Sequence, residues 1–495
     1  MSSKNELPVL VVTLVITVAL TWGVWLLLKP SLQLDRVVLG RESHNPNSEQ
    51  PLSEESTRTL NDRLSPGYRM FFPQGATLEK RAAIELLGDI NNLNPWAEAA
   101  QLLEASLQQN PNDPEARIYL NNVRLGQRSM QDPDFDSRID AILVSVPIES
   151  DPNGALEILR GVAQAQEEAN AADGRKLYVW IADDANDPAI AQQIAIYAAE
   201  SDFVQGVIGH YASDVTLAAA PIYEDGQVVA ISPVSTSVRL SDFSNYFLRT
   251  VPSDAVAAQA LADYMLETLQ QQRATVFYSS ESGYSQSLMS EFSSALSLGD
   301  GQVVNLVDVA DSGFSAQASL EAATQNGTET LVLLPNTGRL DETLQVVQLA
   351  QGRFTLLAGD DVYTPKTLEM GEQAAVDMVV AVPWHILAHE GSEFVSASRQ
   401  LWQGDVNWRT VTAYDATHAL IQAFREHPPE PTVDRLLRRE QVQQALYSSS
   451  FQAMGATEPV LFLQSGDRDM GVQLVRIQPG TRSGLAFEFV PIDAQ

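Results

Sequence analysis

The chain has 495 residues, of which 63 are acidic and 31 are basic, so its formal net charge is −32; 44% of the residues are hydrophobic and none is cysteine. The length predicts about three structural units, and the hydrophobic content excludes wholesale disorder. The negative charge excludes nucleic acids as partners because it repels phosphate backbones, and the lack of cysteine excludes disulfides, thiolate nucleophiles, iron–sulfur clusters and an acylated lipoprotein anchor.

Residues 7–28 form the first predicted element, an apolar stretch without a charged side chain. As a helix with a rise of about 1.5 Å per residue it is about 33 Å long, enough to cross a hydrocarbon layer of about 30 Å. It does not end in a small-x-small cleavage motif, since residues 22–29 read WGVWLLLK. We therefore expect an uncleaved signal anchor, a single transmembrane helix, within residues 1–30.

The basic residues that flank this stretch bear on its orientation. Lys4 precedes it, and Lys29, Arg36 and Arg41 follow it, which taken alone favours a cytoplasmic location for the rest of the chain. Large domains often translocate regardless of such counts, so the nature of the large domain has to decide the orientation.

A polar linker and a helical segment come next. Residues 31–64 are rich in Ser, Asn, Pro and Glu and show no apolar period, which is typical of a flexible linker. Residues 65–136 carry helical patterns over 78–91 and 96–109 and a third that starts at Pro114. Their helix-turn-helix pattern resembles about one and a half tetratricopeptide repeats. A free-standing solenoid usually needs about three. We expect a small α-helical spacer packed against its neighbour, with a peptide-binding groove as the alternative.

From Ile139 onward, short apolar runs alternate with amphipathic helical patterns. The predicted strands lie at 141–146, 177–182, 204–209, 227–231, 275–278, 330–334 and 354–358. Such alternation predicts an α/β fold in which helices cover both faces of parallel sheets. Residues 137–495 exceed the size of a single core, so we expect two doubly wound lobes, with ligands bound beyond the carboxyl ends of the strands.

Motifs of the common enzyme classes are missing from the sequence, which has no G-x-x-x-x-G-K-[ST], no G-x-G-x-x-G, no H-E-x-x-H and no G-x-S-x-G. His385 and His389 are four residues apart, but the proline and tryptophan just before them indicate a strand exit rather than a metal-binding helix. Residues 183–187 imitate part of a calcium loop, yet Asp187 followed by Pro188 is more typical of a helix start. We therefore expect no catalytic residue, no metal and no cofactor.

Polar residues follow several of the predicted strands. Ser213 opens a helix, so its hydroxyl and the free N–H groups of the first turn can hold an anion such as a carboxylate. Thr236 follows the next strand after a proline that leaves carbonyls free, and these oxygens suit an ammonium group. Tyr284 lies at the start of a later helix, and Asp360 follows the strand at 354–358. Each residue alone is typical of capping or turn chemistry.

Together with several ordered motifs, these residues resemble one family. The motifs are residues 183–188 (DDANDP), 207–210 (VIGH), 221–224 (PIYE), 231–233 (ISP) and 248–250 (LRT), then Tyr284 and residues 413–416 (AYDA). In this order they resemble the type I periplasmic binding proteins of the branched-chain amino acid (leucine/isoleucine/valine-binding) class, over residues 139–495. The resemblance implies two α/β lobes joined by three strands, with crossings near Pro252, Pro383 and Glu458 and hinge closure on a ligand between the lobes.

The same resemblance implies a binding site for an amino acid. Ser213 corresponds to the position that holds the α-carboxylate, and the Val234 carbonyl, Thr236 and Asp360 correspond to positions that hold the α-ammonium group. Tyr284 corresponds to an aromatic wall on the second lobe. Gly154 stands where this family often supplies an aromatic lid, which implies a pocket that is wider or closed differently.

The function implied is that of a membrane-anchored solute-binding protein. We expect it to sit in the cytoplasmic membrane by a single pass, with its main domain facing the periplasm, and to capture an amino acid or a similar small polar solute. The expected partners are that ligand, the membrane and the permease of an ABC-type importer, and no nucleic acid. The alternatives are a receptor-type sensor that reports ligand occupancy to a partner protein, an enzyme on the same scaffold, and a scaffold whose cleft has lost its ligand.

Overall fold

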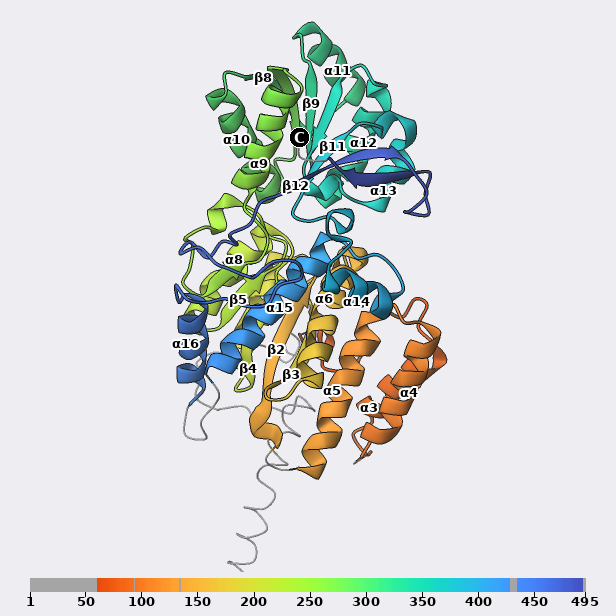
Figure 1. Ribbon diagram of the computed structural model, residues 1–495, viewed down its shortest axis with the longest axis vertical. Coiled ribbons are helices and arrows are strands. Elements are labelled where there is room, and N and C mark those ends of the chain that lie inside the picture. The colour runs from red at the N-terminus through yellow and green to blue at the C-terminus, as the bar shows by residue number, and fades with distance from the viewer. Residues whose placement is uncertain (1–59, 93, 133–134, 428–433, 493–495) are drawn as a thin grey trace, which may run out of the picture.

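The computed structural model describes residues 60–92, 94–132, 135–427 and 434–492 (Figure 1). The expected anchor at residues 1–30 and the linker as far as residue 59 lie outside the described residues. Within the described ranges, no helix is both long enough and apolar enough to cross a membrane. Two α/β lobes follow one another along the long axis of the molecule, and a group of helices packs beside the lower lobe in this view (Figure 1).

Lobe 1 is built on a six-stranded sheet with the order β1-β3-β2-β4-β5-β6. Its strands are β1 (Leu64–Ser65), β2 (Ile139–Val146), β3 (Lys176–Asp183), β4 (Val204–Ile208), β5 (Val229–Ser232) and β6 (Phe247–Arg249). All neighbours pair in parallel except β1, which is antiparallel to β3. β3 and β4 are buried along their whole length, as expected for strands covered on both faces.

The helices of lobe 1 form two packed groups. Helix α6 packs against α15 and α7 against α8. The lobe 1 helices are α6 (Pro152–Ala171), α7 (Pro188–Glu200), α8 (Ser213–Asp225), α14 (Glu393–Trp402), α15 (Trp408–Glu426) and α16 (Arg435–Leu446). The start of α7 confirms the helix signal in the sequence, because the Asp187 carboxylate accepts hydrogen bonds from two first-turn amides and Pro188 occupies the first turn.

Lobe 2 is built on a seven-stranded sheet with the order β13-β12-β11-β10-β9-β7-β8. Its strands are β7 (Arg273–Tyr278), β8 (Gln302–Asp308), β9 (Thr330–Leu334), β10 (Thr355–Ala358), β11 (Val379–Val382), β12 (Gln473–Pro479) and β13 (Phe487–Pro491). Strands β7 to β11 are parallel, and β12 and β13 add an antiparallel edge. The α-helices of lobe 2 are α9 (Asp254–Asp263), α10 (Gly283–Leu298), α11 (Ala316–Gln325), α12 (Leu340–Ala350) and α13 (Pro365–Gly371).

The chain passes between the lobes three times. The first passage joins β6 to α9 and contains Pro252, and the second joins β11 to α14 and contains Pro383. The third joins α16 to β12 and comes later than the sequence predicted. Beyond Glu458 the chain is still bound to lobe 1, where the carbonyl of Gly466 accepts a hydrogen bond from the Arg249 amide at 3.0 Å.

The helical segment is attached to lobe 1 rather than separated from it. It consists of α3 (Leu78–Gly88), α4 (Trp96–Gln109) and α5 (Pro114–Gln131), and α5 packs against α6. The buried Asn122 amide of α5 donates to the Val179 carbonyl of β3 at 2.7 Å and accepts from Gln166 of α6 at 2.8 Å. Leu64, which the sequence assigned to the end of the linker, pairs with Ala182 and is buried in the core.

Candidate ligand-binding site between the lobes

The five residues expected to bind a ligand all lie buried where the two lobes meet. Ser213 is the first residue of α8, and Val234 and Thr236 follow β5, so lobe 1 supplies three of them. Lobe 2 supplies Tyr284 from the first turn of α10 and Asp360 from the short helix η5 (Asp360–Val362) that follows β10. Each therefore stands at or just beyond the carboxyl end of a strand, where a doubly wound sheet binds its ligands.

Tyr284 and Asp360 contact each other directly. The Tyr284 hydroxyl donates to Oδ1 of Asp360 at 2.7 Å. Burial raises the pKa of the Asp360 carboxyl, and this hydrogen bond opposes the rise. Burial also raises the pKa of Tyr284, and the charge of Asp360 adds to that effect. The tyrosine therefore donates a hydrogen bond that fixes the orientation of the acidic group, whereas the resemblance implied only an aromatic wall.

On lobe 1, Ser213 lies at an open helix start. The residue before it, Ala212, offers no side-chain cap, so the first-turn N–H groups of α8 lack the partner that capping residues usually provide. The Ser213 hydroxyl oxygen accepts a hydrogen bond from the Ser237 amide at 3.2 Å, which leaves its own proton free for donation. This arrangement can hold an anionic group.

Val234 and Thr236 differ in how far their polar groups are already used. The Val234 amide donates to the Ser232 hydroxyl at 3.2 Å. The Thr236 carbonyl accepts from the Asp254 amide at 2.8 Å, whereas the Thr236 hydroxyl is buried and makes no hydrogen bond within the described part of the chain. A buried hydroxyl without a partner is costly, and a ligand would supply the missing contact.

Asp254 is a site residue that the sequence did not reveal. It begins α9 directly after the first passage between the lobes, and it is only 1% exposed. Burial raises the pKa of its carboxyl to about 7, and the hydroxyls of Ser287 and Thr236 oppose that rise. Its Oδ2 atom makes no hydrogen bond with any described residue. In the sequence, the Ser-Asp pair before an apolar run is typical of an ordinary helix start.

The sequence also did not reveal a group of contacts in which an arginine joins the two lobes. Nη2 of Arg409, near the start of α15, lies 3.3 Å from Oδ1 of Asp361 in η5. The Arg409 Nε donates to the Tyr211 hydroxyl at 3.1 Å, and its guanidinium stacks over Trp408 at 4.3 Å from the ring centroid. Burial and the neighbouring charge of Asp360 raise the pKa of Asp361 to about 7, despite the arginine.

Tyr211 also changes the interpretation of Gly154. A Cβ atom at Gly154 would lie 2.8 Å from Cε2 of Tyr211 and 2.5 Å from Oδ2 of Asp151, so no larger residue fits there. The ring from the loop after β4 therefore fills the space beside Gly154. Of the two possibilities that the resemblance implied, a wider pocket or one closed differently, the ring of Tyr211 beside Gly154 favours the second.

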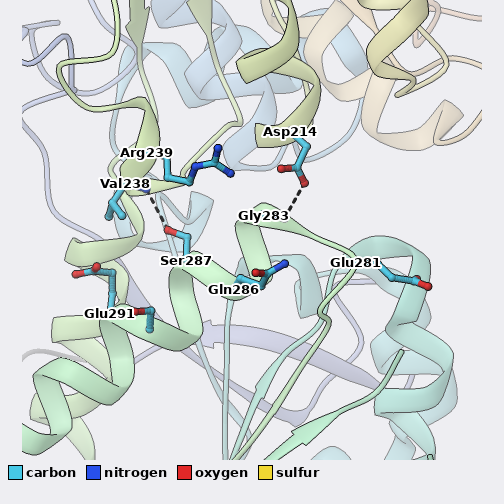
Figure 2. A pocket seen from close by; sticks show the side chains of 9 residues that line it. Asp214, Val238, Arg239, Glu281, Gly283, Gln286, Ser287 and Glu291 are labelled. Atoms are coloured by element: carbon cyan, nitrogen blue, oxygen red, sulfur yellow. Dashed lines mark hydrogen bonds between the residues drawn. The ribbon is translucent and has the colours of Figure 1, made fainter. Parts of the chain in front are cut away.

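Two hydrogen bonds, each donated by a backbone amide to a side chain, link the two lobes, as Figure 2 shows. The Gly283 amide of lobe 2 donates to Oδ2 of Asp214 at 2.6 Å, and the Val238 amide of lobe 1 donates to the Ser287 hydroxyl at 3.0 Å. Beside them lies a cavity of about 390 Å³, lined by Asp214, Val238, Arg239, Glu281, Gly283, Gln286, Ser287, Ser290 and Glu291. The lobes thus touch along one edge, and charged side chains surround the remaining space.

Two buried histidines of the described residues have structural partners. His210 is buried with Nδ1 2.7 Å from Asp184 and Nε2 2.9 Å from the Tyr223 hydroxyl, so both ring nitrogens have structural partners. Burial lowers the pKa of His385 to about 4, and its Nδ1 accepts from the Leu387 amide at 3.3 Å. Within the described ranges, no group of three or more His, Asp or Glu side chains is arranged to hold a metal ion.

Comparison with known proteins identifies a family to which this chain is similar. A model of the periplasmic binding protein family matches residues 152–482. The leucine-specific-binding protein of Salmonella typhimurium is 33% identical over 148 residues, which are 29% of this chain and 40% of that protein. An amino acid binding protein of Pseudomonas aeruginosa is 31% identical over 134 residues, 26% of this chain and 35% of its own. The alignments thus span two fifths or less of these relatives.

Solved structures extend the likeness to the whole two-lobed region. A leucine binding protein from Thermotoga maritima superposes with a TM-score of 0.61 at 22% identity, over 71% of this chain and 97% of its own. An isoleucine complex of a branched-chain amino acid binding protein from Streptococcus pneumoniae gives a TM-score of 0.59 at 17% identity, over 72% of this chain and all of its own. At these identities the likeness establishes the fold.

Proposed function

Because this chain belongs to the periplasmic binding protein family, whose members bind solutes and are not enzymes, we propose that it captures an α-amino acid between its lobes. The observation that carries the proposal is the pairing of an open helix start at Ser213 with the buried carboxyl of Asp360 on the facing lobe. An α-amino acid carries an anionic and a cationic group on one carbon atom, and the two sides of the site match these two charges.

The α-carboxylate binds at the amino end of α8. Free first-turn N–H groups point at such a ligand, and the partial positive charge of the helix end favours its negative charge. The Ser213 hydroxyl adds one donated hydrogen bond. Since this hydroxyl already accepts from the Ser237 amide, its remaining proton is directed away from that amide.

The α-ammonium group binds on the opposite side, between Asp360 and the loop after β5. Asp360 supplies the negative charge, Thr236 supplies a hydroxyl oxygen without a partner, and the carbonyl of Val234 supplies a further acceptor. Tyr284 keeps Asp360 in place through its 2.7 Å hydrogen bond. An ammonium group offers three N–H donors, which this set of acceptors can satisfy.

Binding is coupled to closure of the lobes. The contacts from Gly283 to Asp214 and from Val238 to Ser287 join lobe 1 to lobe 2, so they form only when the lobes approach. A ligand that touches both lobes binds the closed arrangement better than the open one and shifts the population toward it.

The proposal extends to location and partner. We infer that residues 7–28 anchor the chain in the cytoplasmic membrane, that the main domain faces the periplasm and that the bound solute passes to the permease of an ABC-type importer. The uncharged stretch at 7–28 and the family of the domain support this inference. N-terminal sequencing of the mature protein and protease accessibility in spheroplasts test it. A mature start beyond Pro30, or full protection of the domain, would contradict it.

Titration calorimetry on the purified full chain tests the binding function itself. We expect at least one of the common L-amino acids to bind. The N-acetyl derivative of that amino acid, which lacks the ammonium charge, and its methyl ester, which lacks the carboxylate, are both expected to bind much more weakly. A panel of amino acids without any binding, or derivatives that bind equally well, would overturn the proposal.

A further inference from the structure

The two sheets of the described chain have four edge strands, which differ in how they are protected from pairing with another strand. In lobe 1, β1 has two residues and β6 has three, and the Arg249 amide of β6 donates to the Gly466 carbonyl. In lobe 2, β13 has five residues and ends at Pro491. The other edge of lobe 2 is β8, whose seven residues include neither proline nor a basic side chain. Short strands, proline and lysine are common protections of a sheet edge, and β8 has none of them.

The side chains of β8 are incompletely covered as well. No residue of this strand is buried, and Leu306 is 48% exposed, whereas the neighbouring β7 is buried at four of its six positions. The register between β7 and β8 shifts once, so that Val304 has no partner in β7. Such a bulge can itself protect an edge by twisting it, so the sequence of β8 has to decide whether the strand can pair.

That sequence is self-complementary in one antiparallel register. When two copies of β8 run antiparallel about a twofold axis at Asn305, Val303 faces Val307 of the second copy and Val304 faces Leu306 of the second copy. The two Asn305 carboxamides then face each other, and each can donate and accept a hydrogen bond. A register moved by one or two residues in either direction would place Asn305 or Asp308 opposite an apolar side chain.

The charges at the ends of β8 match in the same register. Gln302 then faces Asp308 of the second copy, so that no like charges oppose each other. On its inner side Gln302 pairs with Arg273 of β7, whose Nη1 donates to Oε1 of Gln302 at 3.4 Å. Among the described residues, the Arg273 guanidinium otherwise donates only to the carbonyls of Asn326 and Gly327. The second copy would supply the carboxylate that this arginine lacks, from about 10 Å away at the backbone, and the symmetry would form the pair twice.

We propose that the chain forms a twofold homodimer in which β8 pairs with β8 of a second copy, antiparallel about Asn305, and joins the two lobe 2 sheets into one. The interface uses none of the five expected ligand-binding residues, so it is independent of the proposed function. Seven residues from each copy are fewer than the about 20 to 30 of a standard interface, so the dimer is weak. The net charge of −32 on each copy opposes association, and salt screens that repulsion.

A cross-link tests the pairing and its register. The chain contains no cysteine, so one introduced thiol reports on one position. Across the twofold axis, the Cβ atoms of paired residues lie about 4.5 to 5.5 Å apart, close enough for a disulfide after a small adjustment. We expect Asn305→Cys in the full chain to give a covalent dimer when oxidised with copper phenanthroline. Val303→Cys serves as the control, because its two thiols would lie four residues out of register. Equal cross-linking of both variants, or no cross-linking of Asn305→Cys, would overturn the proposal.

Sedimentation velocity tests the interface without a cross-link. In about 150 mM salt, the unaltered full chain should form a reversible dimer between about 1 and 100 μM, and more salt should strengthen it. Leu306→Lys should raise the dissociation constant by about 10-fold or more, because two apolar cross-strand pairs are lost at once. Leu349→Lys, at an exposed position of α12, should leave it unchanged. A monomer at every concentration, or a dimer that Leu306→Lys does not weaken, would contradict the inference, while amino acid binding would stand or fall separately.

Discussion

Asp361 of lobe 2 and Arg409 of lobe 1 form an ion pair across the boundary of the lobes, with 3.3 Å between Oδ1 and Nη2. The arginine is 5% exposed and the pair is shielded by Tyr211 and Trp408, so little water screens it. Because its members belong to different lobes, the pair would break if the lobes moved apart. If the lobes open and close as proposed above, it would favour the closed arrangement without any ligand.

Loss of this pair should open the molecule. We expect Arg409→Gln and Asp361→Asn to increase the radius of gyration of the ligand-free chain in small-angle scattering, because each removes the same contact between the lobes. Arg399→Gln serves as the control, since Arg399 is paired at the surface with Glu390 and Asp405. An unchanged radius in both cleft variants would show that the pair does not contribute to closure.

Asp360 should matter more for ligand affinity than Ser213. Asp360→Ala removes a buried partner of a charged group, a loss of about 2 to 5 kcal/mol or roughly 30-fold or more in affinity. Ser213→Ala removes a hydroxyl and leaves the first-turn amides of α8, a loss of about 1 kcal/mol. Titration calorimetry on both folded variants gives the order. Unchanged affinity in Asp360→Ala, with a lowered melting temperature, would mean that Asp360 is a structural residue.

Asp254 should make the ligand-free protein less stable as the pH rises. Its folded-state pKa is about 7, above the value of about 3.9 in an unfolded chain, so the folded state holds the proton more tightly. The stabilising effect of that proton is complete below pH 4 and is lost as the pH rises through 7. The loss is at most about 4 kcal/mol for a difference of about three pKa units.

Asp254→Asn should remove this part of the pH dependence. Denaturant unfolding at pH 5 and pH 8 should show a smaller decrease in unfolding free energy for the variant than for the natural chain, with Asp263→Asn, an exposed residue of the same helix, as the control. Asp361 and Asp415, whose pKa values are also raised to about 7 by burial, keep contributing in the variant. Equal decreases in both chains would argue against a buried, titrating Asp254.

Lys80 should be important for the stability of the helical segment. Its side chain is almost fully buried, and its Nζ lies 2.7 Å from both Asp113 and Glu115. Lys80→Met leaves two buried carboxyls without a counter-charge, which costs about 3 to 5 kcal/mol. Lys366→Met, which breaks an exposed pair with Asp341, should cost about 1 kcal/mol or less. Hydrogen exchange over α3 to α5 measures the difference, and equal protection in the two variants would contradict it.

The sequence allowed seven strands of the lobes to be predicted, and with them the position of the five expected site residues near strand ends, because both depend on local patterns; it did not reveal β6, β8, β11, β12 and β13. Buried strands appear as apolar runs, and polar residues at strand ends mark the ligand edge of the sheets. No single motif indicated that Ser213 and Asp360 lie on facing lobes. That expectation came from the family that the motifs resemble when they are taken in order.

The contacts that the sequence did not reveal are all long-range. Arg409 follows Asn407, which caps α15, and this pattern looks like any helix start; only folding places it beside Asp361. Asp254 likewise has the pattern of an ordinary first-turn acid. The third passage between the lobes was placed too early because residues 447–472 contain only isolated bridges and no regular element, so no period marks where the chain leaves lobe 1.

The pairing of β1 with β3 ties the amino-terminal end of the described chain to lobe 1. Through Leu64 and Ser65, the chain that leads in from the amino terminus is hydrogen-bonded into the sheet of lobe 1, and Arg63 adds an ion pair to Asp183. Whatever restrains the amino-terminal end therefore restrains lobe 1 as well. If the lobes open and close on a ligand as proposed above, lobe 2 would swing against a fixed base, and a partner docked on lobe 2 would be displaced when the ligand binds.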